Sequence, residues 1–358
     1  MKRRFWKLAP VFAAVVAAGL AGQAQAVPQS YALSYDNLYN GQVVFLLTGG
    51  ATVSVGIPTP TSSSTAQLNG SGPSQGGSGV SDAPVSVCPG GVGCGPGGSL
   101  PGAAPVNNAF VDYGQAASAG FNYGWGDAHI VSEQNVAPCK PQPSSTGATC
   151  FHAVNEGEAS VTAGNQAVGQ GNNGSGTELS LVFTVGVGTA TIDIQINADP
   201  YLQAFLDSTS LGAPDQARAT LTANASITNL TSGVQVFSWA PNGTGTGANG
   251  GTIVTDPFSL NVSRLVNAAG GGNSIYNPCN FLVPPTGQGT PACGVGNQFE
   301  VFASLAPGTY ELDLTAQELT NVNRVPEPTS IALLGLGMAA LGLMRRRKAD
   351  RKADLSAA

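Results

Sequence analysis

Alternation between apolar and small or polar residues is the feature that most constrains how this chain can fold. Leu179, Leu181 and Phe183 occupy every second position, and Ile192 and Ile194 repeat this period of two. Such a period places the apolar side chains on one face of a β-strand. The pattern returns in three further runs, at residues 219–227, 258–262 and 310–314.

Many alternating strands without a helical period predict an all-β fold, here a jelly-roll-like β-sandwich with long Gly/Ser/Pro-rich loops. Two local segments carry more specific expectations. The segment from Pro200 to Asp207 has proline in its first turn and predicts a short helix. A-P-G-T at 306–309 predicts a hairpin turn. We expect five side chains to be buried in the core: Ile192, Ile194, Ile196, Leu312 and Leu314.

Residues 57–109 have the composition of a loop. They include T-S-S-S-T, N-G-S-G-P-S-Q-G-G-S-G and P-G-G-V-G-C-G-P-G-G. Such a segment offers little apolar surface to offset the conformational entropy lost on folding. We therefore expect a flexible insert here, and we expect residues 62–78 to be dispensable for stability.

The first 26 residues have the organisation of a secretory signal peptide. Basic residues at 2–7 precede an apolar run from Leu8 to Leu20, and Ala24-Gln25-Ala26 is a small-x-small cleavage site. The sequence therefore predicts cleavage by signal peptidase and an exported chain that starts near Val27.

The C-terminal end carries three signals in a fixed order. V-P-E-P at Val325, Pro326, Glu327 and Pro328 comes first, and its prolines disfavour helix and sheet. The uncharged run 329–344 follows and would cross about 24 Å as a helix, so it predicts a short transmembrane segment. A cytoplasmic tail at 345–352 then begins with a basic stop: Arg345, Arg346, Arg347 and Lys348.

This tail, residues 325–352, resembles the PEP-CTERM sorting signal of Gram-negative bacteria. The resemblance implies recognition of Pro326, Glu327 and Pro328 by exosortase, an intramembrane cysteine transpeptidase that removes the membrane segment. It implies a precursor held transiently in the inner membrane and a body then delivered to the cell surface or extracellular matrix. In this family such proteins are linked to biofilm and exopolysaccharide, so exopolysaccharide is the partner that the resemblance suggests.

The exported body, residues 27–324, is strongly acidic. It contains four basic and seventeen acidic residues, a net charge near −13, while the remaining ten basic residues lie in the two targeting ends. A body of this charge does not attract nucleic acid or anionic lipid. Basic partners and divalent cations remain compatible with it.

Six cysteines survive export and fall into three local pairs: Cys88 and Cys94, Cys139 and Cys150, Cys279 and Cys293. An exported chain meets an oxidising compartment, so three disulfides are expected. Sequence order favours pairing between neighbours, although fifteen connectivities satisfy the count. The spacing does not match a zinc site, and no C-x-x-C redox motif occurs.

No catalytic motif stands out in the sequence, and no cofactor is implied. Asp127 and His129 with a serine could form a triad. Carboxylate pairs at 156/158 and 311/313 could serve a glycosidase, but a solvated sheet face is the favoured interpretation. Asp193 and Asp199 are weak calcium candidates, because hard oxygen ligands suit Ca²⁺, yet no EF-hand pattern surrounds them.

Three functional hypotheses follow. The leading one is a non-enzymatic surface or matrix protein of structural or biofilm type. The first alternative is a carbohydrate-binding module, which exposure of Trp125 or Trp239 on a flat sheet face would favour and burial of both would disfavour. The second alternative is a secreted hydrolase, which requires an accessible cleft with convergent carboxylates or a Ser–His contact.

Overall fold

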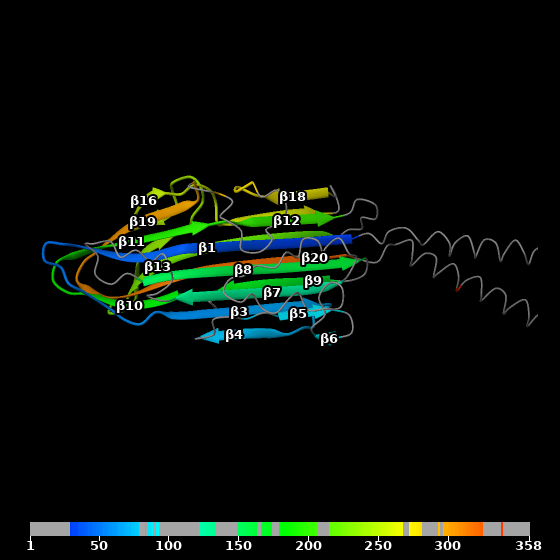
Figure 1. Cartoon of the computed structure of the whole chain (residues 1–358), viewed down its shortest axis with the longest axis horizontal. Helices are drawn as coiled ribbons and strands as arrows, with labels where there is room; N and C mark the ends of the chain where they lie inside the picture. The colour runs from blue at the N-terminus through cyan, green and yellow to red at the C-terminus, as the bar shows by residue number, and fades with distance from the viewer. Residues whose placement is uncertain are drawn as a thin grey trace, which may run out of the picture.

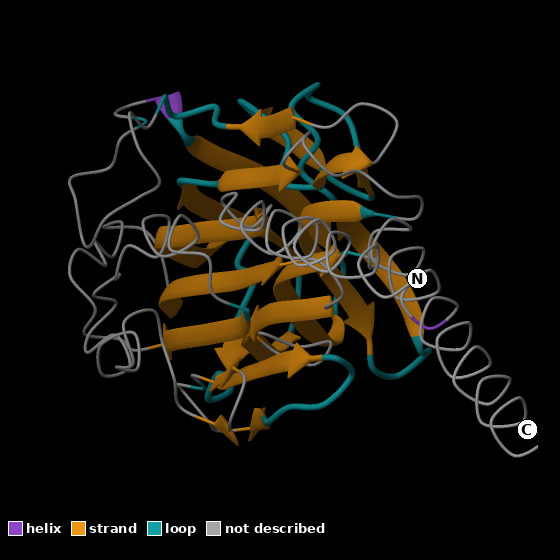
Figure 2. Cartoon of the chain, turned by 90° about the vertical axis from the view of Figure 1, so that its right-hand side faces the viewer, coloured by secondary structure: helices purple, strands orange, loops and turns teal. Residues whose placement is uncertain are grey.

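The chain folds into two antiparallel β-sheets packed face to face, seen in a computed structural model (Figure 1). The structure describes residues 29–78, 83, 85–88, 91–92, 122–132, 149–162, 166–173, 179–206, 215–267, 272–280, 293, 296–324 and 338. Strands make up most of this described chain (Figure 2). The all-β, sandwich-like class predicted from the alternation is confirmed, while a jelly-roll-like order of strands stays a prediction.

The first sheet, sheet A, has ten strands among the described residues. Its main path runs through β16 (Thr252–Thr255), β19 (Gln298–Leu305), β11 (Thr189–Ala198), β1 (Gln29–Thr48), β8 (Thr149–Thr162), β7 (Tyr123–Ser132), β5 (Val85–Cys88) and β6 (Gly91–Val92). Off this path, β12 (Tyr201–Leu206) pairs with β1, and β18 (Gly272–Tyr276) pairs with β12.

The second sheet, sheet B, also has ten strands in the described part of the chain. Its main path runs through β15 (Ala248–Asn249), β14 (Val234–Trp239), β13 (Gln216–Asn229), β20 (Gly308–Asn323), β9 (Gln166–Asn173), β3 (Thr59–Leu68), β10 (Leu179–Val185) and β2 (Val53–Val55). Beside it, β17 (Val262–Asn267) pairs with β13, β4 (Ser74–Ser78) pairs with β3, and β10 also pairs with β20.

Strand β1 is a central strand of sheet A and pairs with two different strands along one of its edges. Its first part pairs with β12 from Ser30 to Tyr35, and its second part pairs with β11 from Leu38 to Thr48. A bulge between Tyr39 and Gln42 lies inside the second part, and Asn40 there has a φ of 51°, which asparagine tolerates better than most residues. One long strand thus changes its neighbour between Tyr35 and Leu38, ahead of the bulge.

The core lies between the sheets and uses the alternation seen in the sequence. All five predicted core side chains are buried: Ile192, Ile194, Ile196, Leu312 and Leu314. Contacts between aromatic rings also cross the interlayer, for example between Phe45 of sheet A and Phe183 of sheet B, whose centroids are 4.9 Å apart. Ser34 in β1 donates a hydrogen bond to the Thr220 carbonyl in β13 at 3.1 Å. Ser34 therefore lies on the face of β1 that points toward sheet B.

The predicted flexible insert at 57–109 is wrong over its first part. Residues 59–68 form β3 and residues 74–78 form β4, and β3 pairs with β9, β10 and β4. Ser62, Ser64 and Ala66 point inward and are at most 2% exposed. Small side chains fit here because the sheets approach closely: a Cβ on Gly124 of β7 would lie 2.7 Å from the Gln67 carbonyl oxygen.

Three further local predictions are also wrong. The predicted helix from Pro200 to Asp207 is strand β12 over residues 201–206, because pairing with β1 and β18 outweighs local helix propensity. The run 258–262 forms a bend with only an isolated bridge at Ser259, and β17 begins at Val262. The A-P-G-T turn is not a hairpin, since it carries the chain from β19 in sheet A to β20 in sheet B. Tyr310 stabilises this crossing by donating its hydroxyl hydrogen to the Ala306 carbonyl at 2.9 Å.

Within the described residues, no helix is long and apolar enough to cross a membrane. The predicted transmembrane segment at 329–344 lies outside these residues apart from Met338, and the predicted signal peptide at 1–26 lies wholly outside them.

Candidate functional site

The strongest candidate site is the point where the folded body ends and the C-terminal signal begins. Strand β20 runs through Asn323, which pairs with Gln216 of β13 on one side and Gln166 of β9 on the other. Residues 317–323 belong to this strand, and Arg324 alone separates it from Val325. The V-P-E-P motif therefore starts one residue after a strand that is paired on both edges.

Arg324, the residue between β20 and the motif, is fixed inside the fold. Its side chain is 1% exposed, and its Nε lies 3.6 Å from the Asp215 Oδ2. Its Nη1 donates a hydrogen bond to the Ser30 Oγ at 3.3 Å. A buried guanidinium needs such partners, because an uncompensated buried charge is costly. The last residue before the motif is therefore an anchor of the domain.

The same contact brings the two ends of the body together. Ser30 is the second residue of β1, and Arg324 follows the last residue of β20. In Figure 1, the start of β1 and the end of β20 lie at the same end of the sandwich. The described body therefore begins and ends at one end of the sandwich, and the C-terminal motif follows from that end.

Sequence reasoning missed Arg324, Asp215 and Ser30 as a connected set. One signal could have indicated Arg324, because it is one of only four basic residues in the exported body. All ten predicted processing residues lie outside the described chain: Ala24, Ala26, Val325, Pro326, Glu327, Pro328, Arg345, Arg346, Arg347 and Lys348.

One of the three predicted local cysteine pairs is confirmed among the described residues. Cys279 and Cys293 form a disulfide, and Cys150 is also disulfide-bonded. None of the described cysteines is free. Cys94 and Cys139 lie outside the described residues, so the pairings of Cys88 with Cys94 and of Cys139 with Cys150 stay predictions.

The two calcium candidates do not converge on one site. Asp193 lies on the outward face of β11, where burial and then the charge of Glu300 raise its pKa to about 6. Asp199 lies beyond the end of β11, roughly 20 Å along an extended chain at about 3.3 Å per residue. Its Oδ1 accepts a hydrogen bond from the Asn297 Nδ2 at 2.8 Å. One ion cannot bind both carboxylates.

The candidate catalytic residues around β7 and β8 gather on the face of sheet A that points away from sheet B. Asp127 is in register with Glu156, and Trp125 with Glu158. The predicted solvated face is wrong for this pair, since Glu156 and Glu158 are 1% and 0% exposed. The Tyr123 hydroxyl donates to the Glu158 Oε1 at 2.5 Å, and burial raises the pKa of Tyr123 well above its usual value.

The carboxylates at 311 and 313 are closer to the surface. Ser180 donates its hydroxyl hydrogen to the Glu311 Oε1 at 2.7 Å. Burial and then the charge of Glu311 raise the pKa of Asp313. The favoured interpretation of a partly solvated sheet face therefore suits this second pair.

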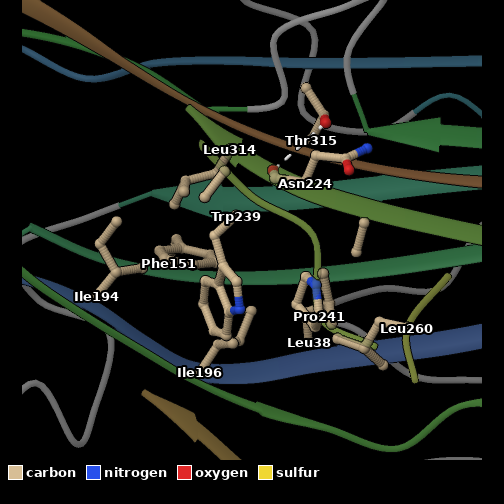
Figure 3. A pocket seen from close by; sticks show the side chains of 12 residues that line it. Leu38, Phe151, Ile194, Ile196, Asn224, Trp239, Pro241, Leu260, Leu314 and Thr315 are labelled. Atoms are coloured by element: carbon tan, nitrogen blue, oxygen red, sulfur yellow. Dashed lines mark hydrogen bonds between the residues drawn. The ribbon is translucent and has the colours of Figure 1, made fainter. Parts of the chain in front are cut away.

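Both tryptophans that could have formed an exposed platform are buried. Trp125 is 5% exposed and Trp239 is 3% exposed. Trp239 lines a small cavity of about 40 Å³ between the sheets, with Phe151, Ile194 and Leu314 (Figure 3). On the outer face of sheet B, a depression of about 410 Å³ lies over β13, β14 and β20 and presents polar side chains: Asn224, Ser226, Gln235, Ser238, Asp313 and Thr315.

Comparison with known proteins identifies one feature. Residues 324–348 match the PEP-CTERM protein-sorting motif, which begins at the anchored Arg324. No curated protein matches the chain. A solved structure of infectious bursal disease virus, Gx strain, is 9% identical over 86% of this chain and 84% of its own, with a TM-score of 0.09, too low to carry an argument.

Proposed function

We propose that this chain, exported and processed by exosortase as its PEP-CTERM motif implies, is a structural protein of the bacterial cell surface or extracellular matrix. In this proposal its body has no catalytic role. The sandwich would act as a rigid, acidic building block, delivered to the outside after removal of the membrane segment.

The observation that carries the proposal is the geometry of the sorting junction. The motif follows a central strand directly, and Arg324 ties that strand to Asp215 and Ser30. Exosortase would therefore act next to a completed fold, without a flexible stalk between the body and the membrane. Such an arrangement suits delivery of one compact unit.

Burial of the candidate binding and catalytic groups supports the structural role over its rivals. Trp125 and Trp239 are not available for stacking on a sugar. Glu156 and Glu158, the best glycosidase pair in sequence, are closed to solvent. A secreted hydrolase would need these groups in an open cleft. The link to biofilm and exopolysaccharide rests on the family resemblance alone.

A localisation experiment tests this proposal. The full chain, with an epitope tag inserted at the exposed residues 244–246, is expressed in a host that contains exosortase. We expect the tag at the cell surface or in the matrix, and we expect deletion of the gene to reduce the mass of matrix. Recovery of the processed protein only in the periplasm, with unchanged matrix, would rule the structural role out.

One observation favours carbohydrate binding as a second candidate. The depression on the outer face of sheet B presents amide and hydroxyl groups beside Asp313, whose Oδ1 lacks a hydrogen-bond partner. A glycan array with the mature protein tests this candidate. We expect any genuine ligand to be lost in Gln235→Ala and Asp313→Asn and retained in Ser304→Ala, on the exposed part of β19. Without a hit on the array, this second candidate is rejected.

A further inference from the structure

Three oxygen-bearing side chains are sealed between the two sheets. Asp36 of β1, Asn155 of β8 and Glu318 of β20 are each 0% exposed. Asp36 and Asn155 are register partners across β1 and β8, so their side chains lie side by side on one face. That face points inward, because Ser34, two residues before Asp36, reaches the Thr220 carbonyl of sheet B.

Glu318 lies opposite this pair. The Ser30–Arg324 contact joins β1 to the end of β20 across the interlayer. Moving six residues forward along β1 reaches Asp36, and moving six residues back along β20 reaches Glu318. Both strands advance by about 3.3 Å per residue, so these two positions also face each other. Burial on alternate residues of β20 confirms that Glu318 points inward.

None of the three side chains has its hydrogen-bonding capacity met within the fold. Both carboxylate oxygens of Asp36, both of Glu318 and both amide atoms of Asn155 lack partners. The backbone amide of Asn37 lies close enough to Asp36 to lower its pKa in part, but not in the geometry of an ordinary hydrogen bond. Buried polar atoms are nearly always paired, so these three side chains are suited to bind a ligand between the sheets.

Electrostatics agree with the geometry. Burial first, and then the charge of Asp36, raise the pKa of Glu318 well above its usual value. Burial also raises the pKa of Asp36 well above its usual value, with a second contribution from the charge of Asp199. Two carboxylates that destabilise each other in an apolar interior need a positive partner or a proton.

We propose that Asp36, Asn155 and Glu318 form an interlayer calcium site that joins the two sheets. Two carboxylates balance the charge of one divalent cation, and the Asn155 carbonyl oxygen supplies a third hard ligand. Packed sheets lie about 10 Å apart, which an aspartate, a cation with ligand bonds of about 2.4 Å and a glutamate together span. The three residues include no histidine or cysteine, the usual ligands of zinc, so the set does not favour zinc.

Calcium is favoured over magnesium by the constraints of this interior. Calcium accepts an irregular set of six to eight oxygens and bidentate carboxylates. Magnesium demands near-ideal octahedral geometry and usually keeps several waters, for which a closed interlayer leaves little freedom. This site is separate from the weak candidates at Asp193 and Asp199, and it does not depend on the proposed structural role.

Direct binding and thermal melting test the site in the mature protein processed in the host. After removal of metal with EGTA, equilibrium dialysis against ⁴⁵Ca²⁺ should show one ion per chain. The melting temperature should rise with calcium concentration, because a ligand that binds only the folded state stabilises it. The same concentrations of Mg²⁺ should raise it far less.

Substitutions make the test specific. Glu318→Gln and Asp36→Asn should each weaken calcium binding at least tenfold, while Glu311→Gln, a partly exposed position on the same strand, should not change it. Absence of bound ⁴⁵Ca²⁺ in the unaltered protein would overturn the site. So would a melting temperature that is equal in EGTA and in calcium, which would indicate that the two acids are simply protonated. If both variants fail to fold, these two measurements on the unaltered protein still decide the question.

Discussion

Arg324 holds the junction between body and sorting motif through its side chain. Its guanidinium lies 3.6 Å from Asp215, both side chains are closed to solvent, and Ser30 accepts a further hydrogen bond. Removing one member of a buried ion pair leaves the other charge uncompensated, which is more costly than replacing both members by apolar groups.

The first prediction concerns this pair. Arg324→Ala should lower the free energy of unfolding by about 3–5 kcal/mol, because Asp215 then remains buried without its counter-charge. The double change Arg324→Met with Asp215→Leu should recover most of that loss. Urea melts measure both effects. Equal stability of Arg324→Ala and the unaltered protein, or a double variant as unstable as the single one, would refute the anchor.

The second prediction concerns Asp193, whose folded-state pKa of about 6 lies above its ordinary value of 3.8. The folded state therefore holds a proton that the unfolded chain releases, and this contribution to stability is lost as pH rises from about 4 through 6. Asp193→Asn should be more stable than the unaltered protein by about 1–2 kcal/mol at pH 7, after allowance for solvent screening.

The pH dependence is the control for Asp193→Asn. At pH 3.5 the side chain is mostly protonated in both states, so the two proteins should have nearly the same melting temperature. A gain of equal size at pH 3.5 and pH 7 would show that the effect of the substitution is not electrostatic.

At the scale of elements, β3 shows where sequence reasoning fails. Its T-P-T-S-S-S-T-A-Q-L sequence has the composition of a loop, yet Ser62, Ser64 and Ala66 are buried between strands. Composition measures how much apolar area a segment can bury, not how close two sheets can come. The backbone of Gln67 comes so close to Gly124 in the other sheet that only small side chains fit between the two sheets here.

The third prediction reverses the expectation from composition. Deleting residues 62–78 removes most of β3 and all of β4, and it breaks the pairing of β3 with β9. The free energy of unfolding should fall by more than about 5 kcal/mol, which is comparable with the whole stability of a domain. The cooperative thermal transition should therefore disappear. Deleting residues 244–246, an exposed turn, is the matched control and should leave the transition in place. A normal melt for the 62–78 deletion would show that β3 is dispensable.

Strand β12 and the 306–309 turn show a second limit of local pattern. The apolar residues Tyr201, Leu202 and Phe205 fit a short helix or a strand equally well, and pairing with β1 and β18 decides between them. The A-P-G-T turn specifies a tight change of direction but not the sheet that the next strand joins. Both outcomes depend on contacts with distant residues.

For the whole molecule, the sequence predicted the class of fold, the buried alternating positions and a C-terminal PEP-CTERM signal. It could not predict which strands pair, because β1 joins partners more than a hundred residues away in β8 and β11. For the same reason it missed the meeting of Ser30 with Arg324 and the facing of Asp36 and Glu318. These arrangements arise only when the two sheets pack.

The central claim is that a completed sandwich leads directly into a signal that exosortase reads. Replacing Pro326, Glu327 and Pro328 with alanine, in a host that contains exosortase, tests this claim most directly. The mass of the chain after membrane fractionation is the measurement. We predict a protein that has lost its signal peptide but keeps its full C-terminus and stays in the membrane fraction, while the unaltered chain is shortened and leaves it. Identical shortening and release of both proteins would contradict the claim.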